Sequence, residues 1–312
     1  MNIAVIGIGG VGGYFGGKLT QLLKDDNSLN IYFIARNQHL AEIQKNGLIL
    51  DSDDGEFICR PTKATDNISE LPMLDLCLVC VKGYDLDKTM PLLKDKISDK
   101  TMILPLLNGV DVYERIRKTI DKGILFPSCV YVGTHIEKPG KVTQRGGTRT
   151  IHFGADPKNS FVDPVIFELF KKADIKYNWL DEPYTEIWSK FVFIAAYGLV
   201  TANFNKTIGE VVASDELSKY TTQIMQEIAS IARKRGVALP ESIENDSFAK
   251  GKNFPFEAKT SFQRDFENID KPDERDLFGG TIIRMGIESG VPTETTKEIY
   301  ESIQKKKKDL SL

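Results

Sequence analysis

The sequence is poor in the residues that build metal sites and disulfides. It has 4 cysteines and 3 histidines among 312 residues. Cys77 and Cys80 have the CxxC spacing, but they lie in a continuous apolar segment that is typical of a buried strand. Residues three apart on a strand point to opposite faces, so we interpret these thiols as small buried apolar side chains. With no second CxxC and no HxxxH pattern, we expect no metal site.

The sequence also lacks a charge imbalance and long apolar runs. It contains 41 Lys and Arg against 44 Asp and Glu, with a net charge of −3, so nothing favours a nucleic-acid partner. No run approaches about 18 consecutive apolar residues, which predicts no membrane-spanning segment. An apolar β-branched segment already begins at Ile3 and leaves no room for a targeting peptide, so we expect a cytoplasmic protein.

Glycine is concentrated near the N-terminus, where it follows an expected strand. Ile3–Ile6 is apolar, Gly7-x-Gly9-x-x-Gly12 comes next, and apolar residues at helical spacing follow. Strand, glycine-rich turn and helix are the context that a dinucleotide-binding fingerprint requires. Such a loop offers backbone N–H groups and a helix N-terminus to a pyrophosphate. The alternative is a glycine-rich turn without a ligand. The predicted cofactor-contacting residues of this loop are Gly7, Ile8, Gly9, Gly10, Val11 and Gly12.

Three further apolar strands each end at a distinctive residue. The segments 31–35, 74–81 and 102–107 lead to Arg36, Lys82 and Asn108. Strands that alternate with helical segments predict a doubly wound α/β sheet of the Rossmann type. Because ligands bind at the carboxyl ends of parallel strands, we expect these residues to face one crevice with the glycine loop.

Arg36 bears on the choice of nicotinamide cofactor. An NAD site has an Asp or Glu at the end of the second strand to bind the ribose 2′-OH, and here Ala35 and Arg36 stand there. An arginine can hold the 2′-phosphate of NADP with two donors, so NADP is preferred over NAD. The alternative is a solvated arginine after a strand.

The texture of the sequence changes at Pro183. We predict a dinucleotide-binding domain over residues 1–182 and a helical domain over 183–312, with helices near 185–202, 214–235, 274–289 and 293–306. The lysine run at residues 305–308 is interpreted as a solvated terminus.

Two places in the helical domain carry candidate chemistry. Lys190 is the only charged residue between Trp188 and Phe204. Burial would lower its pKa toward the range of a general acid, although its head could instead reach water along an apolar surface. The segment 259–265 gathers short donors and ions ahead of Glu274, which could equally serve as a helix-capping anion.

These segments together resemble the ketopantoate reductase family (2-dehydropantoate 2-reductases) along nearly the whole chain. The resemblance implies a Rossmann domain followed by a helical domain, NADPH and substrate in the cleft between them, and hydride transfer to the carbonyl carbon of a 2-keto acid. The matching segments are Gly7–Gly12, Ala35-Arg36, Val81-Lys82, Leu107-Asn108-Gly109, Trp188-Ser189-Lys190, Thr260–Asp265, and Glu274 with Gly279-Gly280.

The resemblance also assigns roles. Lys190 resembles the general acid that protonates the developing alkoxide, and Asn108 a residue that positions cofactor and substrate. Lys82 would lie near the cofactor. Ser261 resembles a contact to the substrate carboxylate. Glu274 resembles the residue that binds the substrate hydroxyl, and is counted with Lys190 as catalytic.

The expected substrate pocket departs from the family pattern. Asparagines four, eight and eighteen residues after the lysine are replaced by Ile194, Gly198 and Ile208. The loop before Glu274 holds one extra residue, so Asp273 competes for its role. A pocket without these amides loses hydrogen bonds to a polar substrate.

The leading hypothesis is NADPH-dependent reduction of ketopantoate to pantoate in pantothenate and coenzyme A biosynthesis. Two alternatives remain: a reductase of a different, more apolar 2-keto acid, and a catalytically silent NADPH-binding protein. The family includes monomers and dimers, so a homodimer is one of two expected states.

Overall fold

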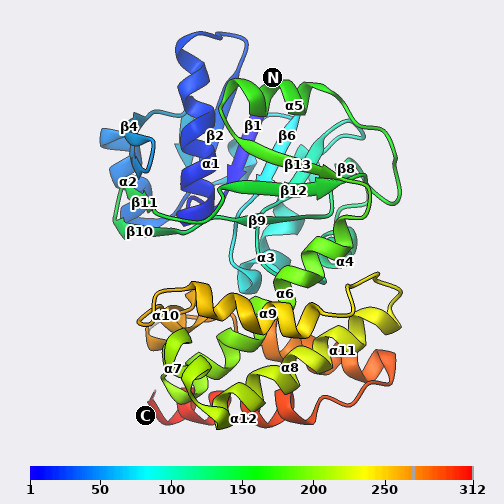
Figure 1. Ribbon diagram of the computed structural model, residues 1–312. Helices are drawn as coiled ribbons and strands as arrows, with labels where there is room; N and C mark the ends of the chain where they lie inside the picture. The colour runs from blue at the N-terminus through cyan, green and yellow to red at the C-terminus, as the bar shows by residue number, and fades with distance from the viewer. Residues whose placement is uncertain (269–270, 311–312) are drawn as a thin grey trace. The chain divides into compact units, whose positions relative to one another are not determined.

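A parallel six-stranded sheet forms the centre of the first half of the chain (Figure 1). The computed structural model describes residues 1–268 and 271–310. The strand order is β5-β2-β1-β6-β7-β8, which reverses direction between β1 and β6, as in a doubly wound fold. The strands are β1 (Asn2–Ile6), β2 (Asn30–Ile34), β5 (Lys63–Thr65), β6 (Leu76–Val79), β7 (Met102–Pro105) and β8 (Ile124–Leu125).

Both faces of this sheet are buried, which explains the continuous apolar runs. In β1, Ile3 and Val5 join one hydrophobic cluster, whereas Ala4 and Ile6 join another on the opposite face. Helices cover the sheet, as parallel strands require. They are α1 (Gly10–Thr20) with η1 (Gln21–Lys24), α2 (Asn37–Asn46), η2 (Ile68–Glu70), α3 (Gly83–Leu93) with η3 (Lys94–Lys96), α4 (Val112–Arg117) and α5 (Val165–Lys172).

The two cysteines of the CxxC pair belong to opposite sides of this sheet. Cys77 is fully buried in one cluster, and burial raises the pKa of its thiol to about 12. Cys80 follows the end of β6 and packs against the other cluster. All four cysteines are free thiols. The interpretation of Cys77 as a buried apolar side chain is confirmed.

Two smaller sheets complete this unit, and they were not expected as separate sheets. The strands β3 (Leu48–Ser52) and β4 (Gly55–Cys59) form an antiparallel hairpin. It continues through β11 (Lys141–Gln144) to β10 (Thr134–Lys138). The third sheet pairs β9 (Ser128–Tyr131), β12 (Thr150–Gly154) and β13 (Lys176–Leu180).

The chain divides into two compact units, Met1–Pro183 and Tyr184–Leu312. The second is helical throughout its described secondary structure, so the predicted fold class, Rossmann-type α/β followed by all-α, is confirmed. Its elements are α6 (Pro183–Phe204), α7 (Ile208–Ala213), α8 (Asp215–Lys234), α9 (Ile243–Lys250), η4 (Gly251–Asn253), α10 (Ser261–Glu267), the π-helical turn η5 (Asp276–Gly280), α11 (Thr281–Ser289) and α12 (Glu294–Leu310).

One helix bears on the expectation that no segment spans a membrane. By length and composition, α6 could cross a membrane. However, 78% of its most apolar window is buried inside the structure, which is also the pattern of a core helix. The exclusion based on uninterrupted apolar runs missed it because Glu186 and Lys190 interrupt the run.

The interpretation of the lysine run at residues 305–308 as a solvated terminus is wrong for two of its lysines. Lys306 donates a hydrogen bond to the backbone oxygen of Asn203, near the end of α6. Lys307 is buried and donates to the backbone oxygens of Phe266 and Asn268. These two lysines therefore bind α12 to α6 and α10. Lysines reaching helix-terminal carbonyls are favoured, and the local sequence alone does not reveal such distant acceptors.

Candidate functional site

The glycine loop between β1 and α1 has three glycines with three different constraints. Gly7 has a φ of +96°, which favours glycine. A Cβ on Gly12 would lie 2.1 Å from the Gly7 carbonyl oxygen, so Gly12 permits close helix–strand packing. A Cβ on Gly9 would meet no atom within 4 Å beyond its chain neighbours. Glycine is therefore not required at position 9 by packing within the protein. The open space beside it is what the close approach of a ligand phosphate to the backbone needs.

The N-terminus of α1 is prepared for an anion. Gly9 is its N-cap and has no side chain to occupy the first-turn N–H groups, and no acidic residue lies in that turn. The Gly13 N–H donates to the Gly9 oxygen at 2.8 Å, which starts the helix. Because the positive end of the helix dipole points the same way, this turn favours a phosphate.

The carboxyl ends of three neighbouring strands bring other predicted residues to the same sheet edge. Arg36 follows β2 as the N-cap of α2, and Lys82 follows β6 as the N-cap of α3. Asn108 follows β7, next to Gly109 with a φ of +129°. All these strands run parallel to β1, so their ends share the edge that carries Gly7. This edge is where open α/β sheets bind ligands.

Arg36 is not a solitary arginine. Its Nη2 atom lies 2.5 Å from Oδ2 of Asp85, in the first turn of α3. The Arg36 side chain is 67% exposed and the Asp85 side chain 18%. The sequence analysis did not single out Asp85. Its only signal is an acidic residue three positions after Lys82, at the start of a predicted helix.

In the helical unit, three phenylalanines connect the elements that carry the other predicted residues. Phe278 of η5 stacks on Phe191 of α6, with 6.0 Å between ring centroids, and contacts Phe262 of α10 at 5.4 Å. The neighbours of these rings in sequence include Lys190 and Ser261, and Glu274 lies one turn before Phe278. The aromatic cluster thus fixes the three backbones from which Lys190, Ser261 and Glu274 project.

Lys190 and Glu274 are both buried, whereas Ser261 is exposed. Lys190 is 9% exposed on a helix whose neighbouring side chains are apolar, and Glu274 is 3% exposed. The Glu274 backbone oxygen accepts a hydrogen bond from the Phe278 N–H at 3.1 Å, at the start of the π-helical turn. Single π-turns of this kind are common at functional sites.

The three positions that depart from the family pattern differ in structure. Ile194 is half-buried and lies one turn after Lys190, on the same face of α6. Gly198 is buried, and a Cβ there would contact the Phe262 ring at 3.5 Å. Ile208 is a core residue, 2% exposed. Of the three, Ile194 is therefore the one that places an apolar surface beside Lys190.

Asp273 is engaged in ion pairs of its own. Its two oxygens accept bonds of 2.8 and 2.5 Å from Arg275, and the Lys307 Nζ lies 3.6 Å away. Its side chain is fully buried. Both Asp273 carboxylate oxygens are thus already bound to side chains of the protein. Residues 269–270 of the preceding loop, where the family comparison suggests one extra residue, lie outside the described part of the chain.

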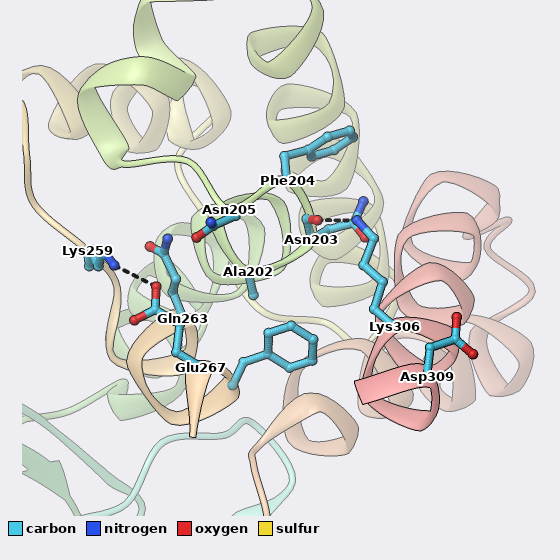
Figure 2. A pocket seen from close by; sticks show the side chains of 10 residues that line it. Ala202, Asn203, Phe204, Asn205, Lys259, Gln263, Glu267, Lys306 and Asp309 are labelled. Carbon is cyan, nitrogen blue, oxygen red and sulfur yellow. Dashed lines mark hydrogen bonds and ion pairs between the residues drawn. The ribbon is translucent and has the colours of Figure 1, made fainter. Parts of the chain in front are cut away.

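A separate pocket of about 750 Å³ lies between the end of α6, α10 and the end of α12 (Figure 2). The Lys259–Glu267 ion pair, at 2.6 Å, is on its rim. Gln263 lines it with an amide that is 1% exposed and has no hydrogen-bond partner among the described residues. Lys190, Ser261 and Glu274 are not among its lining residues, so this pocket is distinct from the predicted catalytic group. Lys259 and Gln263 belong to the segment 259–265 that the sequence marks as a candidate, but no pocket was predicted there.

The described residues contain no group of three or more His, Cys, Asp or Glu side chains that could hold a metal ion. Taken with the glycine loop and the sheet edge, the first unit has the fold and anion-binding features of a dinucleotide-dependent oxidoreductase, and a helical unit follows it.

Family models define the class more closely. Residues 3–158 match the family described as "Ketopantoate reductase PanE/ApbA", and residues 184–307 match the model of its C-terminal part. The chain belongs to this ketopantoate reductase family. It is therefore an oxidoreductase of a family of pyridine-nucleotide-dependent 2-keto acid reductases.

Individual relatives and solved structures that are similar to this chain carry different names. An uncharacterized oxidoreductase, YkpB of Bacillus subtilis, is 26% identical over 97% of this chain and 98% of its own length. The crystal structure of 2-dehydropantoate 2-reductase from Porphyromonas gingivalis W83 is 28% identical, with a TM-score of 0.82 over 97% of this chain and 99% of that chain. A D-mandelate dehydrogenase solved with NADH and anilino(oxo)acetate shares the fold, with a TM-score of 0.84 and 21% identity over the full length of both chains.

Proposed function

We propose that this protein reduces a 2-keto acid with NADPH, with ketopantoate as the leading substrate, in the cytoplasm. The observation that carries the cofactor assignment is the edge of the first sheet. The glycine loop offers an acid-free helix N-terminus, and Arg36 follows β2 where NAD sites have an acidic residue. The open space in front of Gly9 fits a pyrophosphate. When bound, the cofactor supplies the hydride.

The residues of this chain supply the remaining chemistry. Arg36 and Lys82 bind negative charge, and Asn108 orients the bound molecules through its amide. Reduction of a carbonyl places negative charge on oxygen, and Lys190 as an ammonium stabilises that oxygen and gives it a proton from Nζ. An apolar environment strengthens this interaction because water is largely absent.

Ser261 and Glu274 are assigned to the substrate. The exposed Ser261 hydroxyl can donate to the substrate carboxylate, and Glu274 can accept a hydrogen bond from the substrate hydroxyl. The engagement of Asp273 with Arg275 and Lys307 favours Glu274 over Asp273 for this role. A buried carboxylate that already has two cationic partners is poorly suited to a third task.

Ile194 supports a second candidate, the reduction of a more apolar 2-keto acid. It replaces an amide one turn from Lys190 with a branched apolar surface. A D-mandelate dehydrogenase with the same fold was solved with NADH and anilino(oxo)acetate, a ligand with an aromatic ring, which supports this second candidate.

The test is a substrate panel. The purified protein is mixed with NADPH and either ketopantoate, an aliphatic 2-keto acid or an aromatic 2-keto acid, and the loss of reduced-nicotinamide absorbance is followed. Highest kcat/KM with ketopantoate supports the leading function. Highest kcat/KM with an apolar acid selects the second candidate. Tight NADPH binding without turnover of any acid would instead indicate a silent binding protein.

A further inference from the structure

The ion pair between Arg36 and Asp85 places a negative charge where the proposed function puts the cofactor's 2′ substituent. We call this position, formed by Arg36 and Asp85, the corner. The Arg36 Nη2 and Asp85 Oδ2 atoms are 2.5 Å apart. Arg36 is the N-cap of α2, after β2, and Asp85 lies in the first turn of α3, after β6. The guanidinium that the proposed function gives to the 2′-phosphate is therefore already neutralised by a carboxylate of the protein itself.

Asp85 is the fixed half of this pair. Its backbone N–H donates to the Lys82 oxygen at 2.9 Å, and its backbone oxygen accepts from the Thr89 hydroxyl at 2.8 Å. It lies in the first turn of α3, where the helix dipole favours a carboxylate. The Arg36 side chain, at 67% exposed, is long and mostly in solvent. The Asp85 side chain is 18% exposed, so its carboxylate has less freedom to move than the Arg36 guanidinium when an anion arrives.

The two nicotinamide cofactors would meet this carboxylate differently. A 2′-phosphate must share the guanidinium with Asp85, and two anions around one cation repel each other. A ribose 2′-OH can instead donate a hydrogen bond to the carboxylate, as it does to the acidic residue of NAD sites. The nearby cation Lys82 precedes the same helix and attracts both cofactors through their shared pyrophosphate charge.

We propose that Asp85 is a specificity-determining residue that offsets Arg36, so that the protein discriminates weakly between NADPH and NADH. The inference rests on the proposed function only in requiring a dinucleotide at this sheet edge. Asp85→Asn converts the corner into a selective 2′-phosphate site, because it removes the charge and keeps the shape.

The experiment uses two cofactor fragments that differ only in the 2′-phosphate. Calorimetry measures the Kd of 2′,5′-ADP and of 5′-AMP for the wild-type protein, for Asp85→Asn and for the matched control Asp87→Asn. Asp87 lies on the same helix and pairs with Arg115 at 3.1 Å, so its substitution makes the same charge change outside the corner.

The expected result is specific to one nucleotide and one variant. Asp85→Asn tightens 2′,5′-ADP by about tenfold, the scale of repulsion between a carboxylate and a phosphate dianion at about 5 Å in water. It leaves 5′-AMP within about twofold, and Asp87→Asn changes neither nucleotide by more than that. The Kd values of NADPH and NADH, read from reduced-nicotinamide fluorescence, shift in the same way.

Other outcomes separate the two proposals. If both nucleotides bind and Asp85→Asn leaves 2′,5′-ADP unchanged or weakens it, Asp85 merely holds Arg36 in position and the inference is wrong while the cofactor site stands. If neither nucleotide binds the wild-type protein, the dinucleotide site itself is wrong, and the inference falls with the proposed function. The double variant Arg36→Ala/Asp85→Asn should bind 2′,5′-ADP more weakly than Asp85→Asn does, because the attracting guanidinium is gone.

Discussion

The two units build their candidate sites from different parts of the chain. In the α/β unit, the proposed cofactor site is mainly backbone: a loop with open space at Gly9 and the first turn of α1. In the helical unit, the candidate residues are the side chains of Lys190, Ser261 and Glu274, on segments that a cluster of phenylalanines connects. A backbone site tolerates few substitutions and changes little. A side-chain site can change its ligand while the supporting core is kept.

Removing the Lys190 side chain gives the sharpest contrast between the units. If Lys190 is the general acid, Lys190→Ala lowers kcat by about 10²–10⁴-fold, whereas the Kd of NADPH stays unchanged because the cofactor loop lies in the other unit. Steady-state kinetics and fluorescence titration measure the two quantities.

The matched control is Lys206→Ala, which removes an exposed lysine that pairs with Glu210 at 2.8 Å. It should leave both quantities unchanged. A Lys190→Ala protein with wild-type kcat would contradict the mechanism.

The adjacent carboxylates of Asp273 and Glu274 should have different roles, one structural and one catalytic. Asp273→Asn leaves two partly buried cations, Arg275 and Lys307, without their counter-charge and should destabilise the helical unit by about 3–5 kcal/mol. Glu274→Gln should instead lower kcat/KM with little effect on folding. Urea unfolding and kinetics on both variants provide the comparison. The reverse pattern would assign the substrate role to Asp273.

Two glycines of the cofactor loop separate packing from binding within the α/β unit. Gly12→Ala places a Cβ 2.1 Å from a backbone oxygen and should cost about 1–3 kcal/mol of folding free energy. Gly9→Ala meets no protein atom within 4 Å, so it should keep the wild-type Tm while weakening NADPH binding. Thermal unfolding and NADPH titration are the measurements. An equal loss of Tm in both variants would show that Gly9 is a packing glycine.

Substitution of Ile194 tests whether this residue sets the substrate preference. We expect it to have the smallest effect of these variants. Ile194→Asn restores an amide one turn from Lys190 and should shift the ratio of kcat/KM for ketopantoate over an aromatic keto acid by about tenfold toward ketopantoate. Ile208→Val, a conservative change in the core, serves as the control and should leave the ratio unaltered. An unchanged ratio in Ile194→Asn would remove the argument for an apolar substrate.

The strands β1, β2, β6 and β7 were predictable because they form apolar runs in the middle of the sheet, whereas the edge strands β5 and β8 have only 3 and 2 residues. Strand β10, in contrast, consists of exposed or half-buried residues such as His135 and Glu137, so no hydrophobic pattern marks it. Helix α7 has only six residues and depends on a capping box between Thr207 and Glu210 that was not recognised.

The candidate site likewise has parts that a local sequence pattern predicts and parts that it does not. The glycine loop was predictable because its constraints are local: a turn, a helix start and a close approach within ten residues. The Arg36–Asp85 pair joins residues 49 apart in sequence, and the Lys307–Asp273 pair residues 34 apart. Contacts of this kind depend on which elements become neighbours, and a local motif does not contain that information.

The contact of Lys307 with the segment before Glu274 has a consequence for the order of biosynthesis. Asp273 and Arg275 emerge from the ribosome together, but Lys307 follows 32 residues after Arg275, within α12. The ribosomal exit tunnel holds the most recently made part of the chain, so α12 joins the helical unit after the elements that precede it in sequence. During translation, the α/β unit can therefore complete its nucleotide loop early, whereas the segment before Glu274 gains the Lys307 contact only once α12 has left the tunnel.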